Sequence, residues 1–225
     1  MNIETARFNM IEQQIRPWNV LDASVLELLS VVKREDFVPK SHTGLAFADL
    51  EIPLMGTGEE ALAKGQCMLA PRLEARMLQD LAVQAHETVL EIGTGSGYMA
   101  ALLGKMAQRV VSMEISPELA VRARDNLRNA GIQNVEVRQG DGSKVTAADG
   151  SFDAIVLSGS VADAPASLLK LLKAGGRLAA IVGEEPVMRC TVVTKTGDDQ
   201  YSTVQTWDTV APRLQNFPEP SRFKF

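Results

Sequence analysis

The pattern of apolar and polar positions predicts alternating strands and helices from Thr88 onward. Short apolar runs predict strands at 88–92, 109–114, 134–139, 152–159 and 177–183. Between them, helical spacing predicts helices at 98–106, 117–131 and 165–176, the last closed by two glycines. Such alternation indicates a parallel sheet with helices on both faces and right-handed crossovers.

The chain before this region has a different pattern. Val25, Leu28, Leu29 and Val32 recur at helical spacing after Asp22, which predicts a helix with an acidic N-cap. Residues 46–71 contain several prolines and glycines and form a long irregular stretch, which in a compact domain is usually functional. A further amphipathic helix is predicted at 73–83.

The C-terminal part predicts an antiparallel hairpin. Two β-rich runs within 188–212 flank a turn at 197–199. We therefore expect an α/β fold, Rossmann-like and doubly wound, whose mostly parallel sheet carries a C-terminal antiparallel hairpin and follows an N-terminal helical extension.

Composition narrows the class of protein. Of the 225 residues, 45% are hydrophobic and 23% charged, which is typical of a soluble globular chain. The net charge of −5 argues against nucleic acid or an anionic membrane as a partner. The sequence shows no apolar segment typical of a signal or a membrane span. Cys67 and Cys190 lie outside any metal-ligand spacing, and we expect two free buried thiols, no metal and a cytoplasmic location.

The glycine-rich segment after the first strand is the main candidate for ligand binding. Gly93, Gly95 and Gly97 stand between a strand and a helix, where glycine permits unusual backbone angles and close approach of a ligand. The spacing is G-x-G-x-G, and Tyr98 follows where the dinucleotide pattern has its third small residue. This favours a ligand without a pyrophosphate, although a tight turn that binds nothing has the same pattern.

Three acidic residues lie within or directly after the predicted strands and support a nucleoside ligand. Glu114 ends the second strand, where a carboxylate can accept hydrogen bonds from ribose hydroxyls. Asp141 follows the third strand and can accept from an adenine amine, and Glu91, within the first strand, can reach an amino group. Glu114 or Asp141 alone could instead be a solvated loop residue or a helix cap, but together the acids and the loop spacing predict S-adenosylmethionine. The expected cofactor residues are Glu91, Gly93, Thr94, Gly95, Gly97, Glu114, Ile115, Asp141 and Gly142.

With these residues in place, the chain resembles the protein-L-isoaspartate O-methyltransferase family over nearly its whole length. Residues 34–39 (REDFVP) are similar to the family's R-E-x-F-V-P signature, and 46–49 (AFAD) to its A-Y-x-D segment. The stretches 91–103, 110–127 and 139–143 follow its cofactor region, and 210–214 (VAPRL) is a looser match to its C-terminal V-P-L motif.

The resemblance implies methyl transfer from S-adenosylmethionine to a carboxylate of isoaspartyl residues in damaged proteins, a repair reaction. A carboxylate is ionised at neutral pH, with an ordinary pKa of about 4, so alignment and exclusion of water suffice for catalysis. We expect a single methyltransferase domain: 1–85 with the N-terminal helices and the substrate or lid loop, 86–185 as cofactor-binding core, and 186–225 as hairpin and tail.

The substrate loop departs from the family pattern, which reads approximately G-Q-T-I-S-x-P-H. Here residues 65–72 read GQCMLAPR, so Leu69 occupies the position of the family's active-site serine and Arg72 that of its histidine. Leucine cannot donate a hydrogen bond, and the thiol of Cys67 is a weak donor. Arg72 could bind a carboxylate with two hydrogen bonds, or be a surface residue while Leu69 fills a pocket.

Three functions therefore compete. The first is isoaspartyl methylation of a protein or peptide. The second is methylation of another anionic acceptor, and the third is a non-catalytic homologue that binds S-adenosylmethionine. Ser158, after the fourth strand, could contact substrate or methyl donor, or simply form a turn. The oligomeric state is not predicted.

Overall fold

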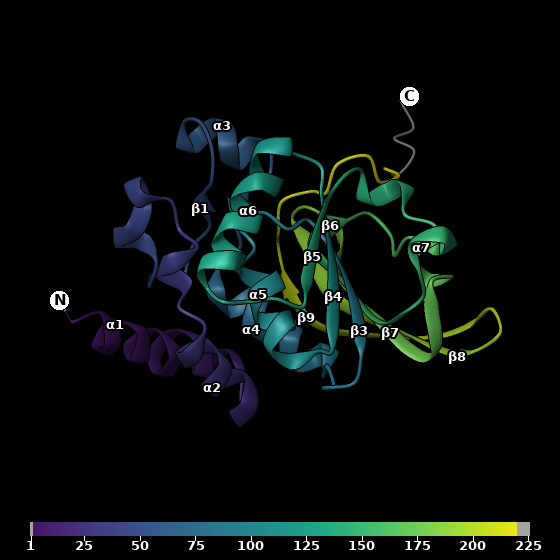
Figure 1. Cartoon of the computed structure of the whole chain (residues 1–225). Helices are drawn as coiled ribbons and strands as arrows, with labels where there is room; N and C mark the ends of the chain where they lie inside the picture. Colours follow the sequence, from purple (N-terminus) through teal and green to yellow (C-terminus); the bar gives the residue numbers. More distant parts are fainter. Residues whose placement is uncertain (1, 220–225) are drawn as a thin grey trace.

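In the computed structural model, which describes residues 2–219, a seven-stranded sheet has the order β5-β4-β3-β6-β7-β8-β9 (Figure 1). The first five strands of this order are parallel, and β8 and β9 are antiparallel. The strand order reverses at β3, with β4 on one side and β6 on the other. This is the switch point at which open α/β sheets bind ligands. The strands are β3 (Thr88–Ile92), β4 (Arg109–Glu114), β5 (Val135–Gln139), β6 (Phe152–Val161), β7 (Leu172–Glu184), β8 (Val187–Gly197) and β9 (Gln200–Thr209).

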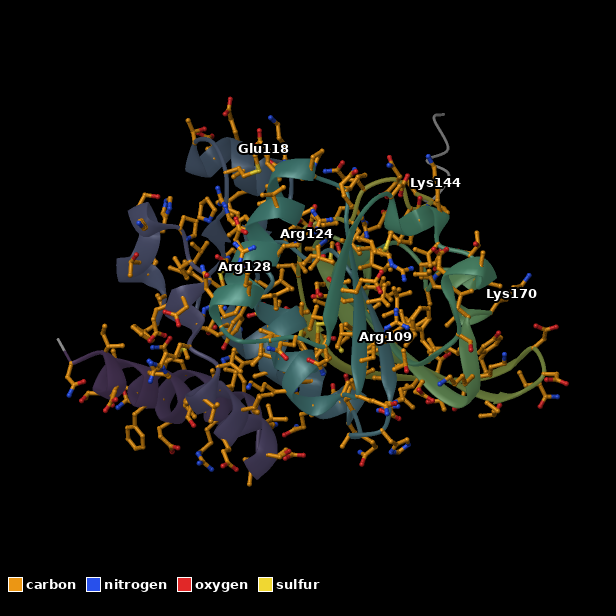
Figure 2. All side chains as sticks on the ribbon, in the orientation of Figure 1. Arg109, Glu118, Arg124, Arg128, Lys144 and Lys170 are labelled. Atoms are coloured by element: carbon orange, nitrogen blue, oxygen red, sulfur yellow. The ribbon has the colours of Figure 1, made fainter. Side chains whose placement is uncertain are left out.

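Helices cover the two faces of the sheet unequally. The helices α4 (Pro71–Leu81), α5 (Tyr98–Met106) and α6 (Pro117–Asn129) pack on one face, over buried residues such as Val110 and Val156. The other face has its own apolar cluster under the short helix α7 (Ala166–Leu169). The predicted doubly wound fold with its C-terminal hairpin is thus confirmed. Charged side chains such as Glu118 and Lys170 point outward (Figure 2).

The N-terminal extension packs on the outside of this helical layer (Figure 1). It contains α1 (Ile3–Met10), a π-helical turn at Ile11–Ile15 and α2 (Ala23–Val31). The carboxylate of Asp22 accepts hydrogen bonds from the backbone of Ser24 and Val25, which confirms the predicted N-cap. Contacts of α2 with α4 and α5 join the extension to the core.

The prediction of a helix at 165–176 is wrong beyond the first helical turn. Only Ala166–Leu169 is helical, and β7 already begins at Leu172, which pairs with Phe152. The buried leucines of this run pack on the sheet from a turn and a strand, so tertiary packing overrides their helical spacing. Gly176 is required here, since a Cβ would meet Asp153 O at 3.0 Å.

The irregular stretch 46–71 contains three short elements. Strand β1 (Ile52–Pro53) pairs antiparallel with β2 (Cys67–Met68), and α3 (Gly58–Ala63) connects them. The side chain of Leu54 lies against Gly95. This stretch therefore covers the glycine loop at the carboxyl end of the sheet.

The helix predicted at 73–83 begins two residues earlier, at Pro71, and ends at Leu81. Pro71 suits the first helical turn because it needs no backbone donor there. The hairpin turn falls at 198–199 as predicted, and Asp199 has a positive φ of 52°. Both cysteines are free and buried. Across residues 2–219, no helix is long and apolar enough to cross a membrane.

Candidate functional site

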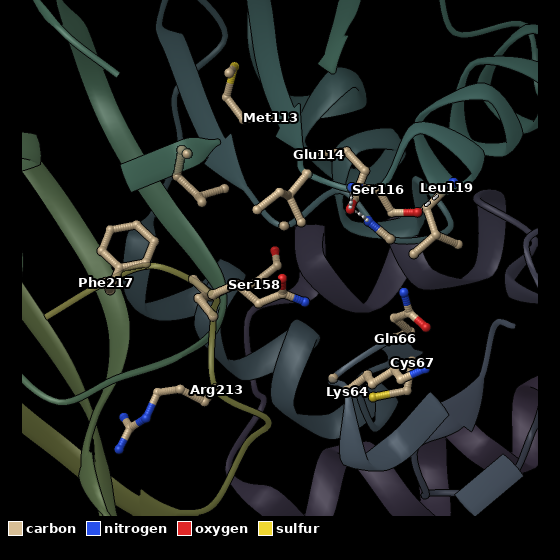
Figure 3. A pocket seen from close by; sticks show the side chains of 18 residues that line it. Lys64, Gln66, Cys67, Met113, Glu114, Ser116, Leu119, Ser158, Arg213 and Phe217 are labelled. Atoms are coloured by element: carbon tan, nitrogen blue, oxygen red, sulfur yellow. Dashed lines mark hydrogen bonds between the residues drawn. The ribbon is translucent and has the colours of Figure 1, made fainter. Parts of the chain in front are cut away.

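A cavity lies at the carboxyl ends of β3, β4 and β6 (Figure 3). It has about 640 Å³ of empty space, counting its open mouth, and is lined by residues of the glycine loop, the end of β4, the substrate loop and the C-terminal segment. Of the residues predicted to bind the cofactor, Gly93, Gly95, Glu114, Ile115 and Gly142 line it. The predicted site residues from three different strands are therefore brought together.

The glycine loop is fastened to the neighbouring strand. The backbone N–H groups of Gly93 and Thr94 donate to Met113 O at 2.9 and 3.2 Å. At the loop's end Gly97 has a φ of 87°, and a Cβ there would meet Ala123 O at 3.3 Å. Glycine at 97 is thus needed both for the backbone angle and for the close approach of α6.

Glu114 is held rigidly at the cavity edge. One carboxylate oxygen accepts from the backbone N–H of Gly95 at 2.8 Å and the other from Ser116 at 2.9 Å (Figure 3). Burial raises the pKa of Glu114, while these backbone donors act in the opposite direction. Each oxygen keeps a further lone pair, so the carboxylate can still accept from two hydroxyls.

Asp141 lies beside the cavity, next to Gly142. One of its oxygens accepts from the backbone N–H and hydroxyl of Ser143, at 3.0 and 2.7 Å. The other accepts from the side-chain amide of Asn216 at 3.0 Å. Burial raises the pKa of Asp141, but these hydrogen bonds outweigh it and hold the pKa below its usual value.

Glu91 is fully buried in β3, and its carboxylate accepts hydrogen bonds from two hydroxyl groups. It accepts from Ser112 at 2.5 Å and from Ser158 at 2.8 Å. Burial raises its pKa to about 7, and the nearby charge of Glu114 adds to the effect. The hydroxyl of Thr94 lies 2.5 Å from that of Ser112, so it belongs to the same network and does not face the larger cavity.

A smaller cavity of about 250 Å³ separates the substrate loop from the glycine loop. On the side of the substrate loop it is lined by Cys67 and Leu69. Its polar lining comes from Glu91, Thr94 and Ser158. Burial raises the pKa of Cys67 to about 12, so its sulfur stays a neutral thiol. Leu69 is 4% exposed and fills the loop's interior as an apolar residue.

The side chain of Arg72 contacts other residues of the same chain. Its guanidinium forms an ion pair with Asp49 and lies over the ring of Trp18, with its central carbon 4.6 Å from the ring centroid. Since its charge is already paired, this geometry favours the structural role for Arg72 over the carboxylate-binding role.

The sequence did not single out the buried ion pair that shapes this loop. Arg34 is fully buried and donates to the carbonyls of Ala46 and Leu69, at 3.1 and 2.9 Å, and to the Glu74 carboxylate at 2.8 Å. The available signal was Glu74, an acid on the apolar face of a predicted helix, three and four residues before Met77 and Leu78.

Burial raises the pKa of Glu74 to about 7 although Arg34 acts in the opposite direction. Glu74 has a cationic partner in Arg34, whereas Glu91 has only hydroxyl partners, so we assign titration near neutrality to Glu91. Among residues 2–219, no group of three or more His, Cys, Asp or Glu side chains is placed to hold a metal.

Comparison with known proteins gives matches to a family of methyltransferases. The family model described as "Protein-L-isoaspartate(D-aspartate) O-methyltransferase (PCMT)" matches residues 5–211. A protein-L-isoaspartate O-methyltransferase of Methanoculleus marisnigri is 40% identical over 177 residues, covering 79% of this chain and 77% of that protein. One from Myxococcus xanthus is 42% identical over 164 residues, covering 73% and 74%.

Solved structures agree in fold. A protein-L-isoaspartate O-methyltransferase structure superposes with a TM-score of 0.78 at 24% identity, covering 92% of this chain and 65% of that one. A Plasmodium falciparum protein in complex with S-adenosyl-L-homocysteine has a TM-score of 0.76 at 19% identity, covering 96% and 99%. At 24% and 19% sequence identity, this structural similarity establishes the fold alone.

Proposed function

The chain belongs to the protein-L-isoaspartate(D-aspartate) O-methyltransferase family, an S-adenosylmethionine-dependent enzyme family, and on that premise we propose how its own residues act. The predicted family is thus confirmed, and with it the methyltransferase class and the cofactor. We propose that the acceptor is the α-carboxylate of an isoaspartyl residue in a protein or peptide. The observation that carries the residue assignments is Glu114, fixed by two backbone donors with lone pairs free toward the cavity.

The donors and acceptors around the cavity fit the cofactor. Glu114 accepts from the ribose hydroxyls, and Asp141, beside the cavity, accepts from the adenine amine, while Gly93 and Gly95 allow close approach. Glu91, which lines the adjoining smaller cavity, pairs with the amino group. When bound, S-adenosylmethionine supplies a methyl group activated by the sulfonium charge.

The remaining task of the protein is alignment. The substrate loop closes over the glycine loop and excludes water, and its shape is set by the bonds of Arg34 to the loop backbone. Because Leu69 has no donor, we assign the hydroxyl contact with the acceptor to Ser158, which lines both cavities. Its single proton, donated to Glu91 in the free protein, turns to the acceptor once the cofactor's amino group occupies Glu91. The acceptor carboxylate needs no general base, since it is ionised at neutral pH.

Methyl transfer can be measured with labelled S-adenosylmethionine. We expect incorporation into an isoaspartyl peptide and none into the matched aspartyl peptide, and Ser158→Ala should lower kcat/KM for the former by about tenfold, the value of one neutral hydrogen bond. Incorporation into a different anionic acceptor alone would replace the proposed substrate. Cofactor binding without any transfer would indicate a non-catalytic homologue.

The adenine assignment has its own test. Asp141→Ala should weaken S-adenosylhomocysteine binding about tenfold or more, because the base loses its carboxylate partner. Isothermal titration calorimetry measures this, with Asp125→Ala on the exposed surface of α6 as the matched control. Equal affinities of the two variants would reject the adenine pocket.

A further inference from the structure

The segment after β9, residues 211–217, crosses the carboxyl edge of the sheet, and we call it the C-terminal strap. Ser160, which is fully buried at the end of β6, fastens it with three hydrogen bonds. Its backbone N–H donates to Pro212 O at 2.7 Å, its carbonyl accepts from the N–H of Leu214 at 2.9 Å, and its hydroxyl donates to Ala211 O at 2.7 Å. The strap is therefore an ordered part of the structure, attached to a strand of the site.

Side chains of the strap line the cavity assigned to the cofactor. Leu214 lies over the glycine loop, since a Cβ on Gly93 would be 3.0 Å from its Cδ2 atom. Phe217 is 7% exposed and belongs to the same apolar cluster as Ile92 and Met113. Figure 3 shows Phe217 and Leu119 on opposite sides of the cavity. The strap thus supplies apolar surface along the length of the cavity.

The strap also occupies the hydrogen-bonding site of Asp141. The side-chain amide of Asn216 donates to one Asp141 oxygen at 3.0 Å, and Lys144 lies 3.5 Å from the same oxygen. An amide NH2 is the same kind of donor as an adenine amino group. Asn216 thus takes one lone pair of this oxygen and the Lys144 ammonium lies close to it, so a base must compete with these donors for the carboxylate.

We propose that the C-terminal strap completes the cofactor site, an inference that rests on the proposed function. Phe217 forms the apolar wall against the adenine, and Leu214 covers the opposite end of the cofactor next to Gly93. Asn216 holds Asp141 in the free protein and gives it up to the adenine amino group when the cofactor binds. Asn216 is therefore a competitor of the base, while Phe217 is its contact.

The two roles predict opposite effects on binding of S-adenosylhomocysteine, measured by isothermal titration calorimetry on the full chain. Phe217→Ala should weaken binding about tenfold or more because the wall is lost, whereas Phe217→Leu, which keeps most of the apolar volume, should weaken it less. The matched control is Phe8→Ala, whose side chain is 62% exposed on α1. Affinity of Phe217→Ala within twofold of the wild type would overturn the proposed wall.

For Asn216→Ala we expect binding about two- to fivefold tighter, since its competing hydrogen bond is removed. Asn129→Ala, an exposed asparagine at the end of α6, is the matched control and should bind as the wild type does. Weaker binding by Asn216→Ala would show that Asn216 positions Asp141 instead of competing for it, and would overturn the exchange.

A measurement on the wild type covers the case in which the Phe217 variants do not fold. Hydrogen exchange of the Leu214 amide, which is bonded to Ser160, should slow at least severalfold in the presence of S-adenosylhomocysteine, because the cofactor packs on the strap. Unchanged exchange at saturating ligand would overturn the proposal. If the wild type binds no S-adenosylhomocysteine at all, the proposed function itself fails, which is a distinct result.

Discussion

At the scale of single residues, the site depends on carboxylates whose surroundings differ. Glu114 is fixed by backbone donors, Asp141 by a hydroxyl and an amide, and Glu91 by two serine hydroxyls in a fully buried position. Only Glu91 combines complete burial with a pKa of about 7 and hydroxyl partners alone. It is therefore the residue through which pH should act on cofactor binding.

We predict that S-adenosylhomocysteine binding weakens about eightfold between pH 7.5 and pH 6. The raised pKa means that Glu91 gains a proton as the pH falls through 7, and the neutral acid cannot pair with the cofactor's ammonium group. Calorimetric titrations at several pH values test this. The profile of Glu91→Gln should be flat over this range, and an equal pH dependence in that variant would assign the effect to another group.

Leu69 permits an equally direct prediction. Leu69→Ser should raise kcat/KM for the isoaspartyl peptide about tenfold, because a hydroxyl donor returns to the substrate loop. Leu69→Ala is the matched control, since it removes the same apolar volume without adding a donor. Equal rates of the two variants would show that no hydroxyl contact is needed at this position.

At the scale of elements, the substrate loop owes its shape to the N-terminal extension. Arg34 lies after α2, yet it bonds the backbone at Ala46 and Leu69 and the α4 side chain of Glu74. A buried guanidinium with five N–H donors in one plane reaches three segments at once. The position of the loop over the glycine loop is therefore coupled to the stability of this ion pair.

Arg34→Met should lower the free energy of unfolding by about 3–5 kcal/mol, because it leaves the Glu74 carboxylate buried without its partner. Urea denaturation followed by circular dichroism measures the change. Arg128→Met removes an exposed ion pair with Asp125 on α6 and should cost less than about 1 kcal/mol. The double variant Arg34→Met/Glu74→Leu should recover part of the loss; no recovery would contradict the assigned cause.

At the scale of the whole molecule, α4 connects the N-terminal extension with the C-terminal hairpin. Arg72, near the start of α4, lies over Trp18 of the extension. Asp80, near its end, accepts from Trp207 Nε1 of β9 at 2.8 Å, and Arg76 lies 4.9 Å from the centroid of the same ring. One face of a single helix thus contacts both ends of the chain, which supports our proposal that 1–225 form one domain.

A single domain should unfold in one cooperative transition. Trp18 and Trp207 report on the two ends, so Trp207→Phe and Trp18→Phe give chains with one fluorophore each. Within each variant, we expect the urea midpoint from fluorescence to coincide with that from far-UV circular dichroism. Separate midpoints in the Trp18-only chain would show that the extension unfolds independently.

The sequence by itself determined the core of the protein. The strands at 88–92 and 109–114, the helix at 98–106, the Asp22 cap and the hairpin turn follow from local periodicity and cap or turn residues, and the structure places them as predicted. The G-x-G-x-G spacing and the acids after the strands located the crevice, because parallel strands present their carboxyl ends at the same edge.

The tertiary structure alone decided the rest, because those features depend on contacts between distant segments. Helical spacing at 165–176 gave no sign that Leu172 pairs with Phe152, and Arg72 could not be assigned before Asp49 and Trp18 were placed beside it. The same holds for Arg34 with Glu74 and for Asn216 with Asp141. Local periodicity reports which face of an element is buried, whereas the partner of a buried charge is set by packing across the whole chain.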